Sequence, residues 1–181
     1  MSRLSVHAKQ TLVIRDDDHI AGPDTATVTI VAYCDFECPY CGRAYPIIKQ
    51  LQARLEDRLR FVFRHFPLIH KHPLAQQAAE AVESADAQGQ FWTMHDLLFE
   101  NQKALEQDDL YIYAESLDLD VGRFERELAG RVHAQRVDRD VRSGRRIGAK
   151  GTPTFFINGS LHTDEDTLER LVLRMSERGP V

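Results

Sequence analysis

The sequence places two thiols three residues apart in the pattern Cys38-Pro39-Tyr40-Cys41. Residues 27–33 are β-branched and apolar and predict a buried strand just before the pair, while Pro39 suits the first turn of a helix that follows. The free backbone amides at a helix N-terminus stabilise a thiolate, so we expect Cys38 to have a lowered pKa and to act as the nucleophile. Cys41 lies within one turn and is placed to resolve a mixed disulfide formed at Cys38. The pattern predicts thiol–disulfide exchange.

A third cysteine, Cys34, lies four residues upstream of the pair and leaves several interpretations open. It is either an inert buried residue or an auxiliary thiol that takes part in exchange. The spacing Cys34-x-x-x-Cys38-x-x-Cys41, with Tyr40 before the last cysteine, is also typical of radical S-adenosylmethionine enzymes, whose cysteines hold an iron–sulfur cluster. Against that alternative, the chain is short for their partial barrel and has no following Gly-Gly-Glu segment. Zinc is disfavoured because the sequence has no second cysteine pair.

The composition limits the class of protein and its partners. The chain has 181 residues, of which 43% are hydrophobic and 28% charged, as expected for one globular domain with or without an insertion. Its net charge of -5 argues against nucleic acid as a partner. The longest apolar runs are far shorter than the roughly 20 residues of a membrane-spanning helix. Residues 1–22 lack a signal-peptide pattern, so we expect a cytoplasmic protein, although an exported relative with its signal removed also fits.

Hydrophobic periodicity divides the chain into four parts. Residues 1–26 form a lead-in, with a short edge strand expected at 11–15. Residues 27–66 predict a strand, a helix and a parallel strand joined by a right-handed crossover. Residues 67–147 have helical periodicity almost throughout, and residues 148–178 predict two strands and a final helix. The expected fold class is α/β, with an all-helical insertion in a β-α-β … β-β-α domain.

Three stretches of the sequence resemble a known family. They are DFECPYCG at residues 35–42, FRHFPL at 63–68 and GTPTFFING at 151–159. Together they resemble the DsbA-like thiol:disulfide oxidoreductases of the thioredoxin superfamily, in particular the branch found free-standing or fused to sodium/proton antiporters. The resemblance implies a thioredoxin fold with an inserted helical domain, which is the element order that periodicity predicts independently.

The resemblance also implies roles for individual residues. Thr152 and Pro153 correspond to the cis-proline loop, which lies against the cysteines and presents backbone groups to an extended substrate; Pro39 and Tyr40 border the same substrate site. From the residues alone, Thr152-Pro153 is equally well explained as a turn that enters a strand. The expected partners are protein or peptide thiols and disulfides together with a redox partner that the sequence does not identify. No cofactor is expected beyond the Cys38–Cys41 pair, and no metal.

The chain departs from the family pattern at two positions. Ala32 stands where the family usually has a buried Glu or Asp, an acid thought to move the proton of the resolving thiol, and Cys34 stands where close relatives have a small residue such as Gly. The Pro39-Tyr40 dipeptide also lacks the histidine of strongly oxidising relatives. With a cytoplasmic location, this favours a reductase or redox relay over oxidative folding. A non-catalytic thioredoxin-like binding module is the remaining alternative.

Two groups of polar side chains are expected to have ordinary structural roles. A loose histidine group, made of His65, His70 and His72, is too unevenly spaced to predict a metal site. Arginines recur every three residues near the end of the helical region and predict a solvated helix face. These arginines are Arg136, Arg139 and Arg142.

Overall fold

The computed structural model describes residues 12–162, 168–170 and 172–174. Its described strands form one mixed sheet in the order β1-β3-β2-β4-β5. The strands are β1 (His19–Ala21), β2 (Val28–Cys34), β3 (Leu59–His65), β4 (Thr154–Ile157) and β5 (Ser160–His162). Strands β2 and β3 are parallel, and the other neighbouring pairs are antiparallel.

Strand β2 lies at the centre of the sheet because its apolar side chains are buried on both faces. Its residue Ala32 pairs with Phe63 of β3 on one side and with Phe155 of β4 on the other. Cys34 ends the strand opposite His65. Since side chains alternate along a strand, Ala32 and Cys34 point to the same face as Phe63 and His65.

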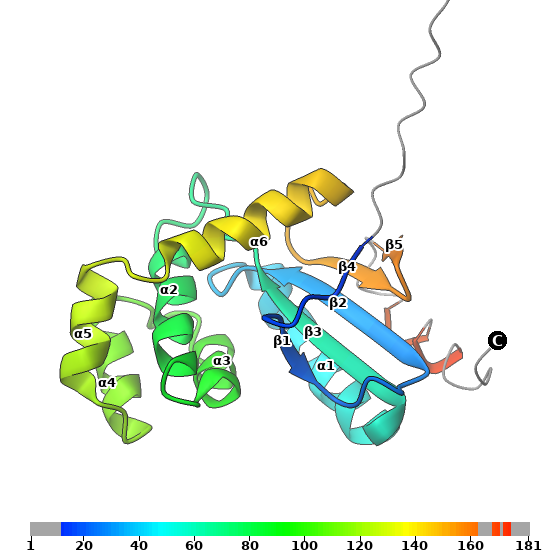
Figure 1. Cartoon of the computed structure of the whole chain (residues 1–181), viewed down its shortest axis with the longest axis horizontal. Coiled ribbons are helices and arrows are strands. Elements are labelled where there is room, and N and C mark those ends of the chain that lie inside the picture. The colour runs from blue at the N-terminus through cyan, green and yellow to red at the C-terminus, as the bar shows by residue number, and fades with distance from the viewer. Residues whose placement is uncertain (1–11, 163–167, 171, 175–181) are drawn as a thin grey trace, which may run out of the picture.

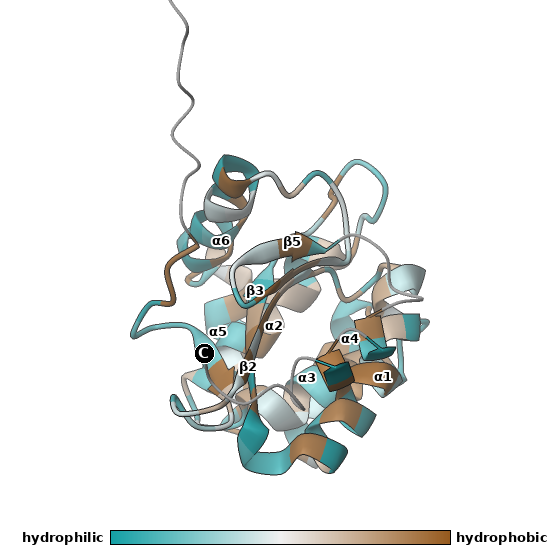
Figure 2. Ribbon diagram, turned by 90° about the vertical axis from the view of Figure 1, so that its right-hand side faces the viewer, coloured by the Kyte–Doolittle hydropathy of each residue, from teal (hydrophilic) through white to brown (hydrophobic). Residues whose placement is uncertain are grey.

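The helices lie on both faces of the sheet and beyond one end of it. They are α1 (Pro39–Leu55), α2 (Ala75–Asp86), α3 (Phe91–Glu100), α4 (Gln107–Ser116), α5 (Val121–Ala129) and α6 (Ala134–Ile147), with a 3-10 turn η1 (Glu56–Arg58) after α1. Helices α2 to α5 gather beyond the end of the sheet, and α6 runs back toward the strands (Figure 1). Figure 2 shows α6 on one side of the strands and α1 with α3 on the other.

Each face of the sheet has its own hydrophobic core. The face that carries Ala32 packs against α1, through residues such as Ile48 and Leu51, and against Leu168 and Val172 near the C-terminus. The other face packs Tyr33 and its neighbours against the side of α6. The cysteine turn between β2 and α1 is therefore built on the larger core, at the edge where the parallel strands end.

The predicted α/β fold class is confirmed, and the position of the edge strand is wrong. Residues 12–15 form no strand; the edge strand is β1 (His19–Ala21), which pairs with β3 after the Asp-rich turn. Of the helix expected at 164–176, residues 168–170 and 172–174 are helical, and the remainder lies outside the described residues. Within the described chain, no helix combines the length and apolarity needed to cross a membrane.

The prediction of a solvated face on α6 holds for Arg142, which is exposed, but is wrong for Arg136, because this helix also covers buried charges. Asp140 has 0% exposed surface and accepts a hydrogen bond from the backbone amide of His65 at 3.1 Å. Arg136, with 13% of its side chain exposed, pairs with Asp140 at 2.6 Å, and Arg15 pairs with Asp140 from the lead-in. Buried carboxylates need such partners, so the arginine spacing reflects a buried ionic network as well as solvation.

Gly144 of α6 is the point of closest approach between this helix and the sheet. A Cβ atom at this position would lie 2.8 Å from the Tyr33 ring and 2.9 Å from the Phe66 ring. Both rings are buried, so there is little room for them to move. We predict that Gly144→Ala lowers the free energy of unfolding by about 1–2 kcal/mol, because overpacking outweighs the gain in helix propensity.

Gly122→Ala in α5 is the matched control. A Cβ atom there meets the end of the flexible Arg126 side chain, at 3.3 Å, and Oδ1 of Asp120 at an ordinary contact distance of 3.5 Å, so the better helix propensity of Ala predicts no loss of stability. Urea unfolding followed by circular dichroism measures both variants. Equal stability changes in the two would show that the approach of α6 to the sheet is not tight.

Candidate active site

The first cysteine of the pair lies at the N-terminus of α1. Cys38 is the N-cap residue, Pro39 follows in the first turn, and no side chain caps the helix. The Cys38 thiol donates a hydrogen bond to the carbonyl oxygen of Thr152 at 3.4 Å, and the Thr152–Pro153 peptide bond is cis. The structure thus brings together the cysteine pair and the Thr-Pro loop, which are more than 100 residues apart in the sequence.

The three cysteines form a connected row of free thiols. The Cys41 thiol interacts with both the Cys38 and the Cys34 thiols, and none of the three is in a disulfide. All three residues are buried, with 7% of Cys34, 2% of Cys38 and 1% of Cys41 exposed. Cys41 is therefore the middle member of the row, and Cys34 approaches the Cys38–Cys41 pair from the end of β2.

The pKa of the Cys38 thiol is raised, opposite to the sequence-based expectation. The main cause is its hydrogen bond with Cys41, followed by burial; a side-chain interaction with Thr152 and the backbone amide of Cys41 act in the other direction without prevailing. Burial also raises the pKa of Cys41 well above its ordinary value. The expectation considered only the helix N-terminus, whereas the folded protein adds a second sulfur and removes water. The reduced pair is therefore protonated near neutral pH.

A buried carboxylate holds the cysteine turn in place. Asp35 accepts hydrogen bonds from the backbone amide of Glu37 at 2.9 Å and from the amide of Leu68 at 2.8 Å. The same side chain contacts Nδ1 of His72 at 2.7 Å, and its backbone carbonyl accepts from the amide of Cys38 at 3.2 Å. The loop after β3 and the turn before α1 are thus joined through one side chain. His72 is partly buried rather than solvated.

The helical insertion also contacts the cysteine turn. Gln102 donates from Nε2 to the carbonyl oxygens of Phe36, at 2.7 Å, and Cys38, at 2.9 Å. This approach requires a glycine next to the pair, because a Cβ atom on Gly42 would collide with Gln102. Sequence reasoning missed the roles of Asp35 and Gln102; the glycine directly after the second cysteine was the available signal for close packing.

Ala32 borders a small cavity under the cysteine pair. The cavity measures about 20 Å³ and is also lined by Cys34 and Cys41. None of its lining residues in the described part of the chain is an Asp or Glu, and the titratable groups besides the thiols are Tyr45 and His95. Burial lowers the pKa of His95, so this imidazole is neutral near pH 7. At Ala32, where the resemblance implies a buried acid, the surroundings therefore consist mainly of apolar side chains and thiols.

The residues between and beside the cysteines face solvent. Tyr40 is 54% exposed, and the guanidinium of Arg43 lies 4.3 Å above its ring. Pro39 is exposed and Pro153 partly exposed. Ile69, on the loop that Asp35 ties to the site, is 54% exposed as well. The surface around the buried thiols therefore combines apolar side chains with the carbonyl-bearing Thr-Pro loop.

The family model described as Thioredoxin matches residues 15–173. This chain belongs to the thioredoxin family. Among solved structures, the thioredoxin fold is shared with oxidised BdbD from Bacillus subtilis, at a TM-score of 0.76 and 22% identity over 87% of this chain and 92% of that one. Wolbachia pipientis alpha-DsbA1 has a TM-score of 0.77 and 16% identity over 92% and 94% of the two chains. The radical-enzyme alternative is wrong, because this thioredoxin fold is not a partial barrel.

Sequence relatives of this thioredoxin-family chain confirm the branch that the motifs indicated. It is 49% identical over 156 residues to Na(+)/H(+) antiporter NhaA 3 of Salinispora tropica, which covers 86% of this chain and 24% of the antiporter. It is 46% identical over 142 residues to Na(+)/H(+) antiporter NhaA of Herminiimonas arsenicoxydans, which covers 78% and 22%. The chain thus spans about a quarter of the length of these curated relatives.

The contact between the two sulfurs gives a test of the Cys38 pKa. Removing Cys41 removes the largest cause of the increase, so we predict that Cys41→Ala lowers the pKa of Cys38 and makes its thiolate available at lower pH. The rate of alkylation by iodoacetamide between pH 6 and 10 measures this, since only the thiolate reacts.

In the wild-type protein, the alkylation rate of Cys38 should keep rising beyond pH 8.5, the ordinary midpoint of a free thiol. The control is Cys34→Ala, which leaves the Cys38–Cys41 contact in place and should leave the Cys38 profile unchanged. A plateau of the wild-type rate below pH 7 would contradict the raised pKa.

Proposed function

We propose that this chain is a thiol:disulfide oxidoreductase that acts on protein or peptide substrates through Cys38 and Cys41. The observation that supports it best is the position of the Cys38 thiol, at the N-cap of α1, against the Thr152 carbonyl and in contact with Cys41. Such an arrangement offers a nucleophile, a resolving thiol within reach and a backbone edge for substrate in one place. The redox-active pair is the only cofactor proposed.

The reaction takes place in two exchange steps. The Cys38 thiolate attacks one sulfur of a substrate disulfide, so a Cys38–substrate bond forms and the other substrate sulfur leaves as a thiolate that takes up a proton. Cys41 then loses its proton and attacks Cys38, which forms the Cys38–Cys41 disulfide and releases the second substrate thiol. The substrate gains two electrons and the chain loses two, which a dithiol redox partner must restore.

The substrate is proposed to bind along the Thr-Pro loop. An extended peptide pairs with the backbone of Thr152 and Pro153 in the manner of an added strand, while Pro39 and Tyr40 contact its side chains. The carbonyl oxygen of Thr152 already accepts a hydrogen bond from the Cys38 thiol, so this loop and the reacting sulfur are in direct contact. The exposed ring of Tyr40 adds apolar contact area beside the buried sulfur.

The proposed direction is reduction, or relay of electrons, rather than oxidative folding. A strongly oxidising pair owes its potential to a stabilised reduced form with an acidic thiolate. Here the pKa of Cys38 is raised, so that stabilisation is missing. A cytoplasmic location, proposed from the sequence, would keep the pair reduced. The expected reduction potential is nearer to the value of about -270 mV for thioredoxin than to the value of about -120 mV for DsbA.

The roles of the two cysteines predict different failures. With dithiothreitol as the electron donor, the wild-type chain should catalyse the reduction of insulin disulfides. Cys38→Ser should abolish this catalysis, because the attacking sulfur is gone. Cys41→Ser should keep the first step and accumulate a mixed disulfide, visible by mass spectrometry as a covalent chain–substrate adduct. The wild-type protein in glutathione buffers gives the reduction potential on the same preparation. No turnover by wild-type protein would favour the non-catalytic binding module.

Cys34 is proposed as an auxiliary thiol within the same site. When Cys38 and Cys41 are joined, the Cys34 thiolate attacks the Cys41 sulfur, which forms a Cys34–Cys41 disulfide and releases Cys38 as a thiolate. No external oxidant is needed, because one disulfide replaces another. The hydrogen bond between the Cys34 and Cys41 thiols supports this step, as does the burial of both groups away from competing thiols.

The auxiliary role predicts a disulfide that does not involve the nucleophile. In Cys38→Ser, oxidised glutathione should oxidise the two remaining thiols to a Cys34–Cys41 disulfide, which peptide mapping identifies. In the control, Cys34→Ser/Cys38→Ser, Cys41 has no internal partner and should remain a thiol or carry glutathione. Retention of two free thiols in Cys38→Ser would show that Cys34 is an inert core residue.

A further inference from the structure

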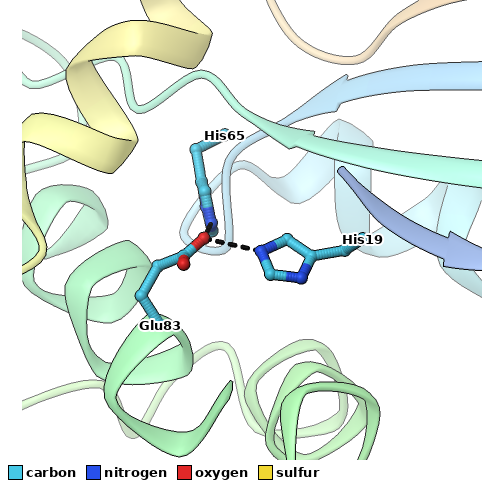
Figure 3. Close-up of side chains that lie close together, drawn as sticks. All are labelled: His19, His65 and Glu83. Atoms are coloured by element: carbon cyan, nitrogen blue, oxygen red, sulfur yellow. Dashed lines mark hydrogen bonds and ion pairs between the residues drawn. The ribbon is translucent and has the colours of Figure 1, made fainter. Parts of the chain in front are cut away.

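A second cluster of reactive side chains lies in the core, apart from the thiols. Nε2 of His19 and Nε2 of His65 each lie 2.7 Å from the same carboxylate oxygen, Oε1 of Glu83 (Figure 3). These three atoms all lie within 4.8 Å of one another. The side chains of His19, His65 and Glu83 are 8%, 1% and 5% exposed, respectively, so all three are buried. By its position in the sequence, His65 belongs to a loose group with His70 and His72, whereas the fold brings it to residues 46 and 18 positions away.

The backbone fixes these side chains without help from a ligand. His19 pairs with Phe63 across β1 and β3, so His65, two residues further along β3, is its diagonal neighbour on the same face of the sheet. The His19 ring stacks on Phe91 at a centroid distance of 3.5 Å and an angle of 9°. Glu83 projects from the last turn of α2 toward both rings (Figure 3). Both imidazoles are therefore directed at one point before any ion binds.

We propose that His19, His65 and Glu83 form a binding site for a divalent metal ion of the zinc type. Two imidazole nitrogens and one carboxylate oxygen are a ligand set that zinc uses, with the fourth position left to water. In the metal-bound form, each neutral ring gives up its Nε2 proton to solvent and takes up one proton from solvent at Nδ1, so its charge does not change. Asp86 Oδ1 lies 3.6 Å from Nδ1 of His19, where a carboxylate orients a metal-bound imidazole. The ion replaces the two hydrogen bonds that the rings now donate to Glu83.

The alternative is a purely structural hydrogen-bond cluster. Within the described residues, Nδ1 of His65 has no hydrogen-bond partner, so the His65 ring is polar-bonded only through Nε2, the atom that a metal ion would bind. The two interpretations differ in whether the folded chain binds Zn²⁺ at this cluster. A positive charge also lies close to the cluster: Nε of Arg136 is 3.8 Å from Oε1 of Glu83. The charge of this guanidinium is partly balanced by its ion pair with Asp140.

A metal ion at this position would join the sheet to the helical insertion. His19 and His65 belong to the sheet and Glu83 to α2, so one ion would be held by both parts of the fold. His65 also stands opposite Cys34 in the register of β2 and β3. Binding to the native state alone raises stability in proportion to the logarithm of free metal concentration. The effect is measurable without any assay of thiol exchange.

The test uses the 181-residue chain in which all three cysteines are replaced by serine, because thiols bind zinc on their own. Isothermal titration with Zn²⁺ gives stoichiometry and affinity, Co²⁺ gives a visible spectrum that reports the ligands, and thermal unfolding is followed with and without Zn²⁺. The variants in this background are His19→Gln and Glu83→Gln. His133→Gln is the matched control, because His133 also pairs with a glutamate, Glu127, at 3.0 Å, but has no second histidine.

The expected result is one Zn²⁺ per chain, a rise in melting temperature with Zn²⁺, and a Co²⁺ spectrum of nitrogen and oxygen ligands. His19→Gln and Glu83→Gln should each weaken Zn²⁺ binding at least tenfold and remove the thermal shift, whereas His133→Gln should match the parent. If Glu83→Gln fails to fold by circular dichroism, His19→Gln decides alone, since it keeps the carboxylate. Absence of stoichiometric Zn²⁺ binding in the folded parent, or unchanged binding in His19→Gln, would overturn the proposal.

Discussion

The arrangement of the thiols depends on the buried carboxylate of Asp35. This one side chain accepts hydrogen bonds from the amides of Glu37 and Leu68 and contacts His72, so it links the turn before α1 to the loop after β3. Its side chain is fully buried, where an unpaired carboxylate would be costly. The turn can therefore shift only if several hydrogen bonds break together. That cooperativity keeps Cys38 at the helix N-cap and against Thr152.

Held in this way, the thiols have an electrostatic environment that a helix N-terminus alone does not describe. The dipole of α1 and the amide of Cys41 favour a negative sulfur at Cys38, but the neighbouring thiol and the loss of water oppose it. Two sulfurs in contact cannot both ionise readily, and burial removes the water that would solvate even one thiolate. The pair is consequently more stable as thiols than an exposed helix-capping cysteine would be, and this is the physical basis for proposing a reducing direction.

Much of the fold followed from local patterns, and most of the contacts did not. The β-branched run of β2, Pro39 at the start of α1 and the helical periodicity up to Gly148 predicted the element order, because these signals depend on neighbours in sequence. The cysteine pair was identifiable for the same reason. The edge strand was misplaced because pairing with β3, rather than propensity, selects His19–Ala21. Asp35, Gln102 and the His19–His65–Glu83 cluster act across distances that no local pattern encodes.

The helical insertion is part of the site rather than an appendage to the sheet. Gln102 binds the carbonyl of Cys38, and Leu74 donates its amide to Glu37 at 2.7 Å, so residues on both sides of α2 and α3 contact the cysteine turn. Glu83 of the same insertion meets the two histidines of the sheet. Both contacts join a polar group of the insertion to a polar group of the sheet or the cysteine turn. Moving the insertion away from the sheet would leave these polar groups without hydrogen-bond partners. The insertion and the sheet therefore constrain each other, and the position of Cys38 is a property of their association.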